Sequence, residues 1–232
     1  MEIAQFPIKS CGKKTLFGRQ ALKIISVNVG QPSKLMSRGR EVTTGIRKSP
    51  VSDPVYVSNV GITGDRVLNA KHHGGPDQAV YGYRIEDYRW WTKELGYPVE
   101  RCTFGENLTF EGLGSAALPI GSRLHFEQVV FEVTAPRIPC QTLNAVMQNN
   151  QFSKLFAREA RSGFYFRVIN EGELTAGENF ELEYFDESAP STVDLFHANY
   201  RNLEKSELEN FISWPIDMRT KRKFQRQLER IT

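Results

Sequence analysis

Short runs of apolar residues, bounded by turn-forming residues, recur along most of the chain. They cover residues 23–29, 55–59, 79–83, 107–110, 123–133, 164–170 and 178–184. Many are bracketed by Gly, Pro, Asn or Asp, as in Gly-Ile-Thr-Gly-Asp at 61–65 and Asn-Glu-Gly at 170–172. Repeated short strands with turn signals between them are typical of a β-sandwich or a closed β-barrel, not of a sheet wound by βαβ units. The pattern therefore predicts a mainly β fold.

Two helices are expected within this β-rich part. Residues 85–95 place Ile85, Tyr88, Trp91 and Leu95 on one face, and Gly96 follows as a stop signal. Residues 151–161 form the second candidate helix, which is closed by a glycine at 163.

The pattern changes after residue 187. Ser191 and Ser206 each begin a segment that resembles a helix N-terminus, and the second has the spacing of a capping box. Phe224, Leu228 and Ile231 form an apolar stripe at helical spacing. We therefore expect three parts: an N-terminal extension over 1–20, a β domain over 21–187 and a three-helix unit over 188–232.

Composition narrows the class of protein. The 232 residues are 40% hydrophobic and include 15 Phe, enough to fill a substantial core. No apolar stretch approaches the ~20 residues of a membrane helix, and residues 1–20 lack the apolar region of a secretory signal. Three cysteines without CxxC spacing argue against a disulfide framework, so a cytoplasmic location is expected.

Charge gives little support for nucleic-acid binding. The net charge is +3. The C-terminal helix candidate does carry six basic residues against two acidic ones over 217–230. Its one aromatic residue, Phe224, belongs to the apolar stripe and leaves no stacking platform for bases. A solvated helix face is therefore favoured over a nucleic-acid interface.

Thr-Ala-Pro-Arg-Ile-Pro-Cys at 134–140 is the stretch richest in chemistry. Two prolines fix the backbone and exclude a helix, so the position of Cys140 is largely preset. Arg137 lies three residues away and favours the thiolate, the form that attacks electrophiles and binds soft metals. A buried structural cysteine beside a Pro-rich turn fits this stretch equally well.

Three further groups could line a site. His72 and His73 precede a Gly-Gly-Pro turn, where backbone can approach a ligand closely. As a zinc site this is poor, because neighbouring extended side chains point to opposite faces and no HExxH or cysteine pair is present. A turn that bonds its own backbone is the alternative.

Asn107 precedes a strand and could either read a heteroaromatic ring edge or cap a turn; the segment alone favours the cap. Arg47, Lys48 and Arg66 lie near strand ends and could clamp a phosphate, although solvated surface charge is the default for each one.

Taken in order, these segments resemble one family. The motifs are Gly-Ile-Thr-Gly-Asp-Arg at 61–66, His-His-Gly-Gly-Pro-Asp-Gln-Ala at 72–79, Phe-Gly-Glu-Asn-Leu at 104–108, Ile-Gly at 120–121 and Pro-Arg-Ile-Pro-Cys at 136–140. Their order and spacing are similar to those of molybdenum cofactor sulfurase C-terminal (MOSC) domain proteins. Within that family the chain resembles the bacterial hydroxylaminopurine-resistance branch, which carries a C-terminal three-helix unit.

The resemblance implies a closed Greek-key β-barrel with its functional loops at one cleft. It implies that Cys140 is a direct ligand of molybdenum and the catalytic residue. It implies further that the molybdenum cofactor is bound by other residues near these motifs. Asn107 would contact the pterin, and Lys48 and Arg66 would bind the phosphate. His72, His73 and Arg137 are implied as cofactor-binding residues only by their positions in the motifs.

The leading hypothesis is a cytoplasmic oxidoreductase that uses this cofactor to reduce N-hydroxylated compounds, such as base analogues, to amines. An external redox protein must supply electrons, because no flavin, haem or iron–sulfur motif is present and three cysteines cannot build a four-cysteine cluster. A small-molecule substrate is expected and a membrane is not; a homodimer remains open.

Two alternatives use the same thiol differently. Cys140 could carry sulfur or deliver the cofactor without turnover, although the chain has no pyridoxal-phosphate desulfurase portion. It could also act as a hydrolase nucleophile with His72 or His73 as its base, which requires the two side chains within ~3 Å.

Overall fold

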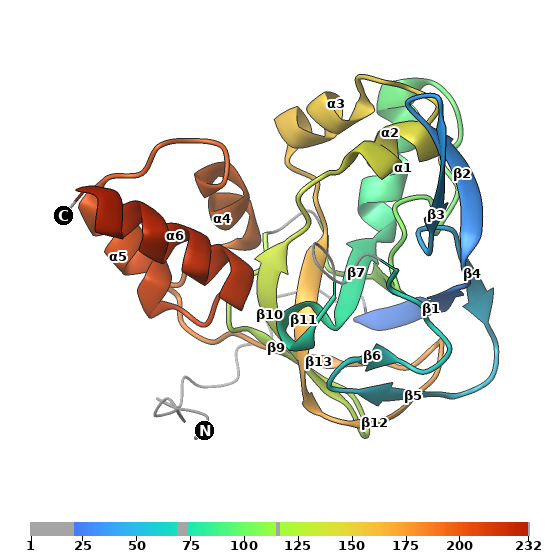
Figure 1. Ribbon diagram of the computed structural model, residues 1–232. Coiled ribbons are helices and arrows are strands. Elements are labelled where there is room, and N and C mark those ends of the chain that lie inside the picture. Colours follow the sequence, from blue (N-terminus) through green and yellow to red (C-terminus); the bar gives the residue numbers. More distant parts are fainter. Residues whose placement is uncertain (1–20, 69–73, 115–116, 232) are drawn as a thin grey trace.

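The computed structural model describes residues 21–68, 74–114 and 117–231 (Figure 1). Most of its strands are short, as the sequence predicts. They are β1 (Lys23–Gly30), β2 (Ser33–Ser37), β3 (Arg40–Thr44), β4 (Lys48–Val51), β5 (Val55–Ser58), β6 (Gly61–Ile62), β7 (Val80–Arg84), β8 (Leu108–Glu111), β9 (Arg123–His125), β10 (Val130–Pro136), β11 (Phe164–Asn170), β12 (Gly172–Leu174) and β13 (Glu181–Glu183). The helices are η1 (Pro76–Gln78, 3₁₀), α1 (Ile85–Leu95), α2 (Gln141–Val146), α3 (Phe152–Glu159), α4 (Thr192–Ala198), α5 (Lys205–Ser213) and α6 (Met218–Ile231).

A mixed eight-stranded sheet with the order β13-β9-β10-β11-β7-β8-β1-β4 occupies the centre of the molecule. A three-stranded sheet β12-β5-β6 and the β2–β3 hairpin complete the β structure. The prediction of a mainly β fold is confirmed. One feature differs from the expectation: β7 and β8 pair in parallel and are joined through α1, so the chain contains a βαβ unit.

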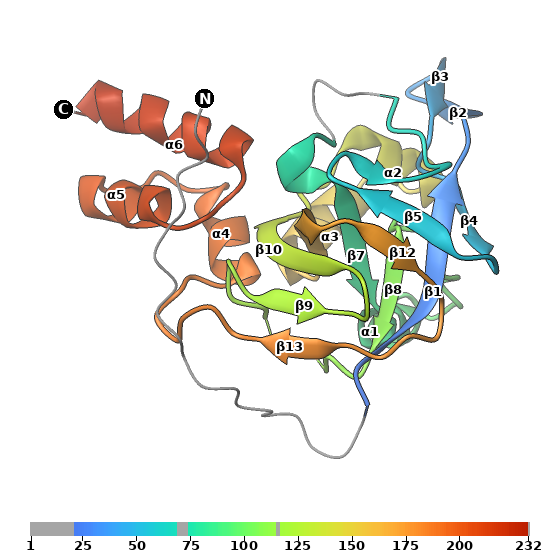
Figure 2. The same ribbon diagram turned by 90° about the horizontal axis from the view of Figure 1, so that it is seen from below.

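Closure of the sheet into a barrel stays a prediction, because no strand ladder joins β13 to β4 among the described residues. The segment just before β13 does reach β1. Ile24 N donates to Glu178 O at 2.9 Å, Phe180 N to Leu22 O at 3.0 Å, and Gly177 N to Ile24 O at 2.7 Å. Figure 2 shows β13 and β1 approaching each other at this side of the molecule.

Several element predictions hold closely. The helix expected over 85–95 is α1 with the same bounds, and Gly96 ends it in the left-handed region at φ 74°. The single run expected over 123–133 is instead the hairpin of β9 and β10, because the chain turns at 126–129. The hairpin keeps both strands in the sheet, where β10 pairs with β11 on its other side.

The C-terminal helices lie beside β10, away from α1, α2 and α3 (Figure 1). Ser191 is the N-cap residue of α4, as predicted, and it forms a capping box with Asp194 that was not expected there. The prediction for Ser206 is wrong: Glu204 is the N-cap residue of α5, and its box is closed by Glu207, so Ser206 lies inside the helix. Carboxylate oxygens at 204 and 207 accept backbone N–H bonds as a serine would.

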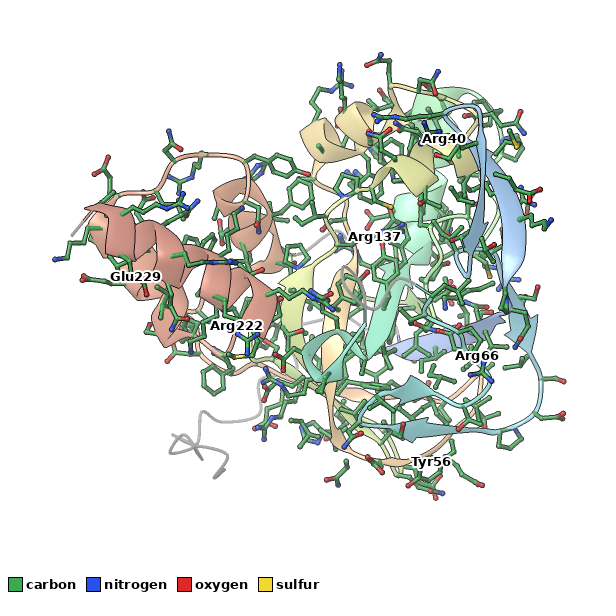
Figure 3. The ribbon with its side chains drawn as sticks, viewed as in Figure 1. Arg40, Tyr56, Arg66, Arg137, Arg222 and Glu229 are labelled. Carbon is green, nitrogen blue, oxygen red and sulfur yellow. The ribbon has the colours of Figure 1, made fainter. Side chains whose placement is uncertain are left out.

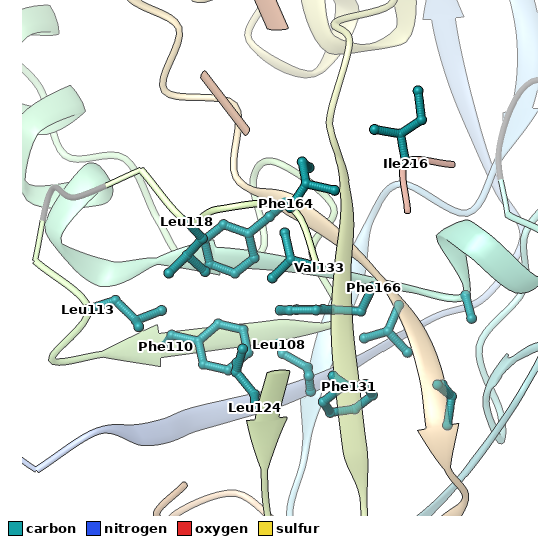
Figure 4. Packing of buried hydrophobic residues seen from close by; sticks show 14 of the residues in the cluster. Leu108, Phe110, Leu113, Leu118, Leu124, Phe131, Val133, Phe164, Phe166 and Ile216 are labelled. Carbon is teal, nitrogen blue, oxygen red and sulfur yellow. The ribbon is translucent and has the colours of Figure 1, made fainter. Parts of the chain in front are cut away.

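The core is continuous between the sheet and the C-terminal helices. The larger hydrophobic cluster includes Phe110, Phe131 and Phe166 from the sheet together with Ile216 and Phe224 from the helical part. Figure 4 shows Ile216 beside this packing. A second, aromatic cluster lies under α1, α2 and α3 and contains Tyr81, Tyr83, Tyr88, Trp91, Phe104, Leu143, Phe152 and Phe156. That residues 188–232 form a separate domain stays a prediction.

Within the described residues, the longest helices are too short and too polar to cross a bilayer. Met1–Gln20, the predicted N-terminal extension, lies outside the described residues.

Candidate functional site

A cavity of about 370 Å³ opens where the loop before β4, the loop after β6, η1 and the Pro-rich loop after β10 meet. The structure brings together most of the residues that the sequence singles out: its lining includes Lys48, Arg66, Asn107, Arg137 and Cys140. His72 and His73 lie outside the described residues. Leu68 and Gly74, on either side of that gap, also line the cavity.

Cys140 is half-buried at the end of the Pro-rich loop. Its backbone is extended, at φ −120° and ψ 170°, and it immediately precedes α2. The non-helical setting expected from the two prolines is therefore confirmed. Its thiol is close enough to Arg137 and to Tyr165 to interact with both electrostatically.

Arg137 is the cation nearest the interior of the site. It is 4% exposed, donates through Nη1 to the carbonyl of Phe104, and lies over the Tyr81 ring at 5.1 Å from the centroid. Figure 3 shows it near the middle of the molecule, whereas Arg66 lies toward the β4 side. Burial opposes the charge on Arg137, but Tyr81, Tyr165 and Cys140 more than offset this effect, so its pKa is raised. The guanidinium is a permanent positive charge beside the thiol.

Asp65 accepts hydrogen bonds from three separate segments on the polar side of the cavity. Its Oδ1 accepts from Lys48 Nζ and, at 2.7 Å, from Gly30 N, while its Oδ2 accepts from Asn107 Nδ2 at 2.9 Å. The Lys48 and Asp65 side chains are each 7% exposed. No role for Asp65 is expected from the sequence, although it lies between Gly64 and Arg66 in one of the motifs.

Asn107 is engaged mainly with the protein itself. Its amide nitrogen donates to Asp65 Oδ2 and, at 3.3 Å, to the carbonyl of Asn28. Its Oδ1 accepts from Tyr81 N at 3.2 Å. Both amide hydrogens are therefore used, and only an acceptor lone pair is left for a ligand. The side chain joins three segments and orients Asp65, whereas contact with a pterin stays a prediction.

Lys48 and Arg66 offer two different kinds of positive charge. Burial lowers the pKa of Lys48, and Asp65 and Glu106 partly offset that effect. Arg66 is exposed at the cavity wall, and its backbone N donates to Gly30 O at 3.0 Å. The ion pair with Asp65 therefore fixes the position of the Lys48 ammonium group, whereas the exposed side chain of Arg66 can move toward a ligand.

Close backbone approach brings these segments together. A Cβ on Gly45 would lie 2.1 Å from the carbonyl oxygen of Arg66, and a Cβ on Gly30 would lie 2.3 Å from that of Gly45. Real side chains do not tolerate such distances. Glycine at 30 and 45 therefore allows β1, the loop before β4 and the loop after β6 to cross at one point.

A buried carboxylate lies behind Lys48. Glu106 is 0% exposed and accepts from the Tyr88 hydroxyl at 2.8 Å, from Cys102 N at 3.0 Å and from the Thr109 hydroxyl at 3.2 Å. Burial raises the pKa of Glu106, and these hydrogen bonds moderate the effect. Burial also raises the pKa of Cys102 to about 12, with Glu106 adding to it, so that thiol is inert.

Comparison with known proteins identifies the fold and the family. The MOSC domain family model matches residues 69–181. The "Uncharacterized protein YflK" of Bacillus subtilis is 33% identical over 184 residues, which cover 79% of this chain and 83% of that protein. The chain belongs to the MOSC domain family. The crystal structure of YiiM from Geobacillus stearothermophilus superposes with a TM-score of 0.73 at 28% identity, covering 89% of this chain and 99% of that one. This MOSC protein therefore falls in the YiiM-like branch, as the resemblance indicated.

A third relative is named for an activity. A protein called "Reductase" from Gibberella moniliformis is 30% identical over 165 residues, which cover 68% of this chain but 29% of that protein. The MOSC chain thus matches less than a third of the fungal protein's length.

Proposed function

We propose that this MOSC protein binds the molybdenum cofactor and reduces N-hydroxylated compounds to amines, with Cys140 as the protein ligand of the metal. The observation that carries the proposal is one cavity that holds a half-buried thiol, a permanently charged Arg137 and the separate cations Lys48 and Arg66. The fungal relative called a reductase supports the reaction class.

The donor set fits a cofactor that brings its own metal ligands. The described residues contain no group of three or more His, Cys, Asp or Glu able to hold a bare metal ion. A single thiolate from Cys140 suits a thiophilic metal that is otherwise ligated by the pterin's sulfurs. Lys48 and Arg66 are the side chains that would take the anionic phosphate group.

The chain's own residues contribute binding and charge. Arg137 favours the thiolate of Cys140, while Asp65 holds Lys48 in place. When bound, the cofactor would supply a metal centre that accepts the oxygen atom and provides the two electrons. The overall reaction breaks the N–O bond of R–NHOH and takes up two electrons and two protons to give R–NH₂ and water. The electrons come from an external redox protein, consistent with a chain that has no redox motif of its own.

Metal content is the first test. The protein is produced in a host that makes the cofactor and purified without oxygen, and molybdenum is measured for wild type, Cys140→Ala and Cys140→Ser. We expect close to one molybdenum per wild-type chain and loss of most of it in Cys140→Ala, together with loss of reduction of an N-hydroxylated substrate by reduced viologen.

Cys102→Ala is the matched control, because that thiol is buried and does not line the cavity. It should keep the wild-type metal content. Wild-type protein that carries a persulfide on Cys140 and no molybdenum would overturn the reductase and support a sulfur carrier in its place.

A further inference from the structure

Gln78 lies in η1 and lines the cavity. Both the nitrogen and the oxygen of its side-chain amide are hydrogen-bonded to residues at the start of α6. Its Nε2 donates to Asp217 Oδ1 at 3.2 Å, and its Oε1 accepts from Arg219 Nη1 at 2.7 Å. These contacts span 139 and 141 residues of sequence. The amide therefore cannot flip without losing both bonds, and its orientation is fixed by the residues that begin α6.

Asp77 of η1 is anchored to the same helix and also to β11. Met218 N donates to Asp77 Oδ2 at 2.9 Å, and Arg167 Nε donates to Asp77 Oδ1 at 2.7 Å. Asp217 is 1% exposed and also accepts from Arg219 N and Thr220 N, as a helix-capping side chain does. Asp217 and Arg219, called here the clamp on Gln78, are therefore themselves held in place by hydrogen bonds at the start of α6.

Gln78 keeps half of its hydrogen-bonding capacity. A glutamine amide has two N–H donors and two acceptor lone pairs. One of each is used by Asp217 and Arg219, and the described residues provide no partner for the second N–H or the second lone pair. The side chain is half-buried in the cavity wall. Asp217 and Arg219 therefore fix the orientation of an amide that still has one donor and one acceptor to offer.

Tyr165 connects this amide to the thiol. Its ring lines the cavity and lies 5.0 Å from the Tyr81 ring, tilted by 38°. Its hydroxyl interacts electrostatically with Arg137 and Cys140 and also with Arg219 and Asp217. The aromatic wall therefore extends from the candidate metal ligand to the clamp.

We propose that Gln78 selects substrates by binding the edge of a planar nitrogen heterocycle with an adjacent donor and acceptor, and that Asp217 and Arg219 are the positioning residues that orient it. A glutamine amide pairs in this bidentate way with the amino group and ring nitrogen of adenine. Tyr165, which is half-buried in the cavity wall, supplies aromatic surface for a ring face. The inference rests on the proposed function, since it names the residue that selects among substrates of the same cavity.

Binding is tested by calorimetry with adenine, using protein purified from a host that makes the cofactor. Gln78→Leu removes both hydrogen-bonding groups while keeping similar volume, and we expect the Kd for adenine to rise about 5- to 30-fold. Unsubstituted purine lacks the amino donor and should bind more weakly than adenine to wild type. No measurable binding of adenine, or equal affinities of wild type and Gln78→Leu, would overturn the proposal.

The clamp is tested with Arg219→Met, and Arg222→Met serves as its control. Both changes remove one arginine from α6, but Arg222 is exposed, and among the described residues no hydrogen bond or ion pair joins its side chain to η1. Figure 3 shows Arg222 on the helical unit. We expect Arg219→Met to weaken adenine binding severalfold, Arg219→Lys to recover part of the loss, and Arg222→Met to bind as wild type does. Equal effects of Arg219→Met and Arg222→Met would remove the positioning role.

Kinetics separate this inference from the proposed function. Reduction of 6-hydroxyaminopurine is compared with reduction of phenylhydroxylamine, which lacks the heterocyclic edge. We expect Gln78→Leu to lower the ratio of the two kcat/KM values at least tenfold, mainly through KM for the purine. If wild type reduces neither compound, the proposed function fails; if it reduces both and the ratio is unchanged in Gln78→Leu, only the role of Gln78 fails.

Discussion

Glu106 is a carboxyl group that the fold buries completely, and its protonation couples folding to pH. Burial raises its pKa above the unfolded value of about 4.3. As the pH rises past that value, the unfolded chain loses this proton before the folded protein does, so this group's contribution to stability falls. The contribution is full below the unfolded pKa and is lost as the pH passes the folded pKa.

Glu106→Gln removes this titration. We expect the unfolding free energy of wild type, relative to that of Glu106→Gln, to decrease as the pH rises from about 4.3 toward neutrality. Urea denaturation at a series of pH values measures the difference. A difference that stays flat or grows with pH would contradict the role assigned to burial.

Glu111→Gln is a control of opposite sign. Hydrogen bonds from Lys23 and Arg89 lower the pKa of Glu111, so its contribution is present above the unfolded pKa and is lost as the pH falls through the folded one. Wild type relative to Glu111→Gln should therefore gain stability as the pH rises from below the folded pKa of Glu111 to its unfolded pKa of about 4.3, and stay level above it. The gain should be slight, because the ion pairs are solvent-screened.

Individual residues differ in how far the sequence predicts them. Cys140 and Arg137 stand out because two prolines fix their loop locally, and the structure places both at the cavity. Asp65 and Gln78 have partners up to 42 and 141 residues away, which no local pattern reveals. Asn107 lines the cavity, but its hydrogen bond to Asp65 depends on the crossing of distant segments.

At the scale of elements, local signals predict helices better than short strands. Helix α1 has a strong apolar face and a glycine stop, and its bounds agree with the expectation. Five short strands were not predicted, because they have two to five residues and are defined by their partners rather than by their own pattern. They are β2, β3, β4, β6 and β12. The capping box of α5 was misplaced by two residues because acidic residues can cap as serine does.

The apolar stripe of α6 is real but shorter than expected. Phe224 is 0% exposed and its ring centroid lies 5.7 Å from that of Phe211, whereas Ile231 is 54% exposed. We expect Phe224→Ala to lower the unfolding free energy by about 3–5 kcal/mol, since it removes a fully buried ring. Urea denaturation measures this loss.

Ile231→Ala is the matched control on the same stripe, with an expected change within about 0.5 kcal/mol because the side chain is mostly in solvent. Comparable losses for the two variants would mean that the end of α6 is buried in solution, for example against a second copy of the chain.

At the scale of the whole molecule, the helical part is tied to the sheet by backbone as well as by core. Ile120 N donates to Pro190 O at 2.9 Å, Thr192 N to Leu118 O at 2.9 Å and Asp217 N to Thr134 O at 3.2 Å. Composition and periodicity predicted a boundary between the β domain over 21–187 and the three-helix unit over 188–232, since they show a change of element type but not the packing between elements. The buried residues of both parts form one hydrophobic cluster.

This continuity predicts one cooperative unfolding transition for the full chain. Scanning calorimetry should give a single peak with a calorimetric enthalpy close to the van't Hoff enthalpy. Phe224→Ala should move that whole peak to lower temperature, since unfolding α6 would expose residues on which the sheet also packs. A separate early peak in Phe224→Ala, with the main peak unmoved, would show instead that residues 188–232 unfold as an independent domain. The clamp on Gln78 would then open before the sheet melts.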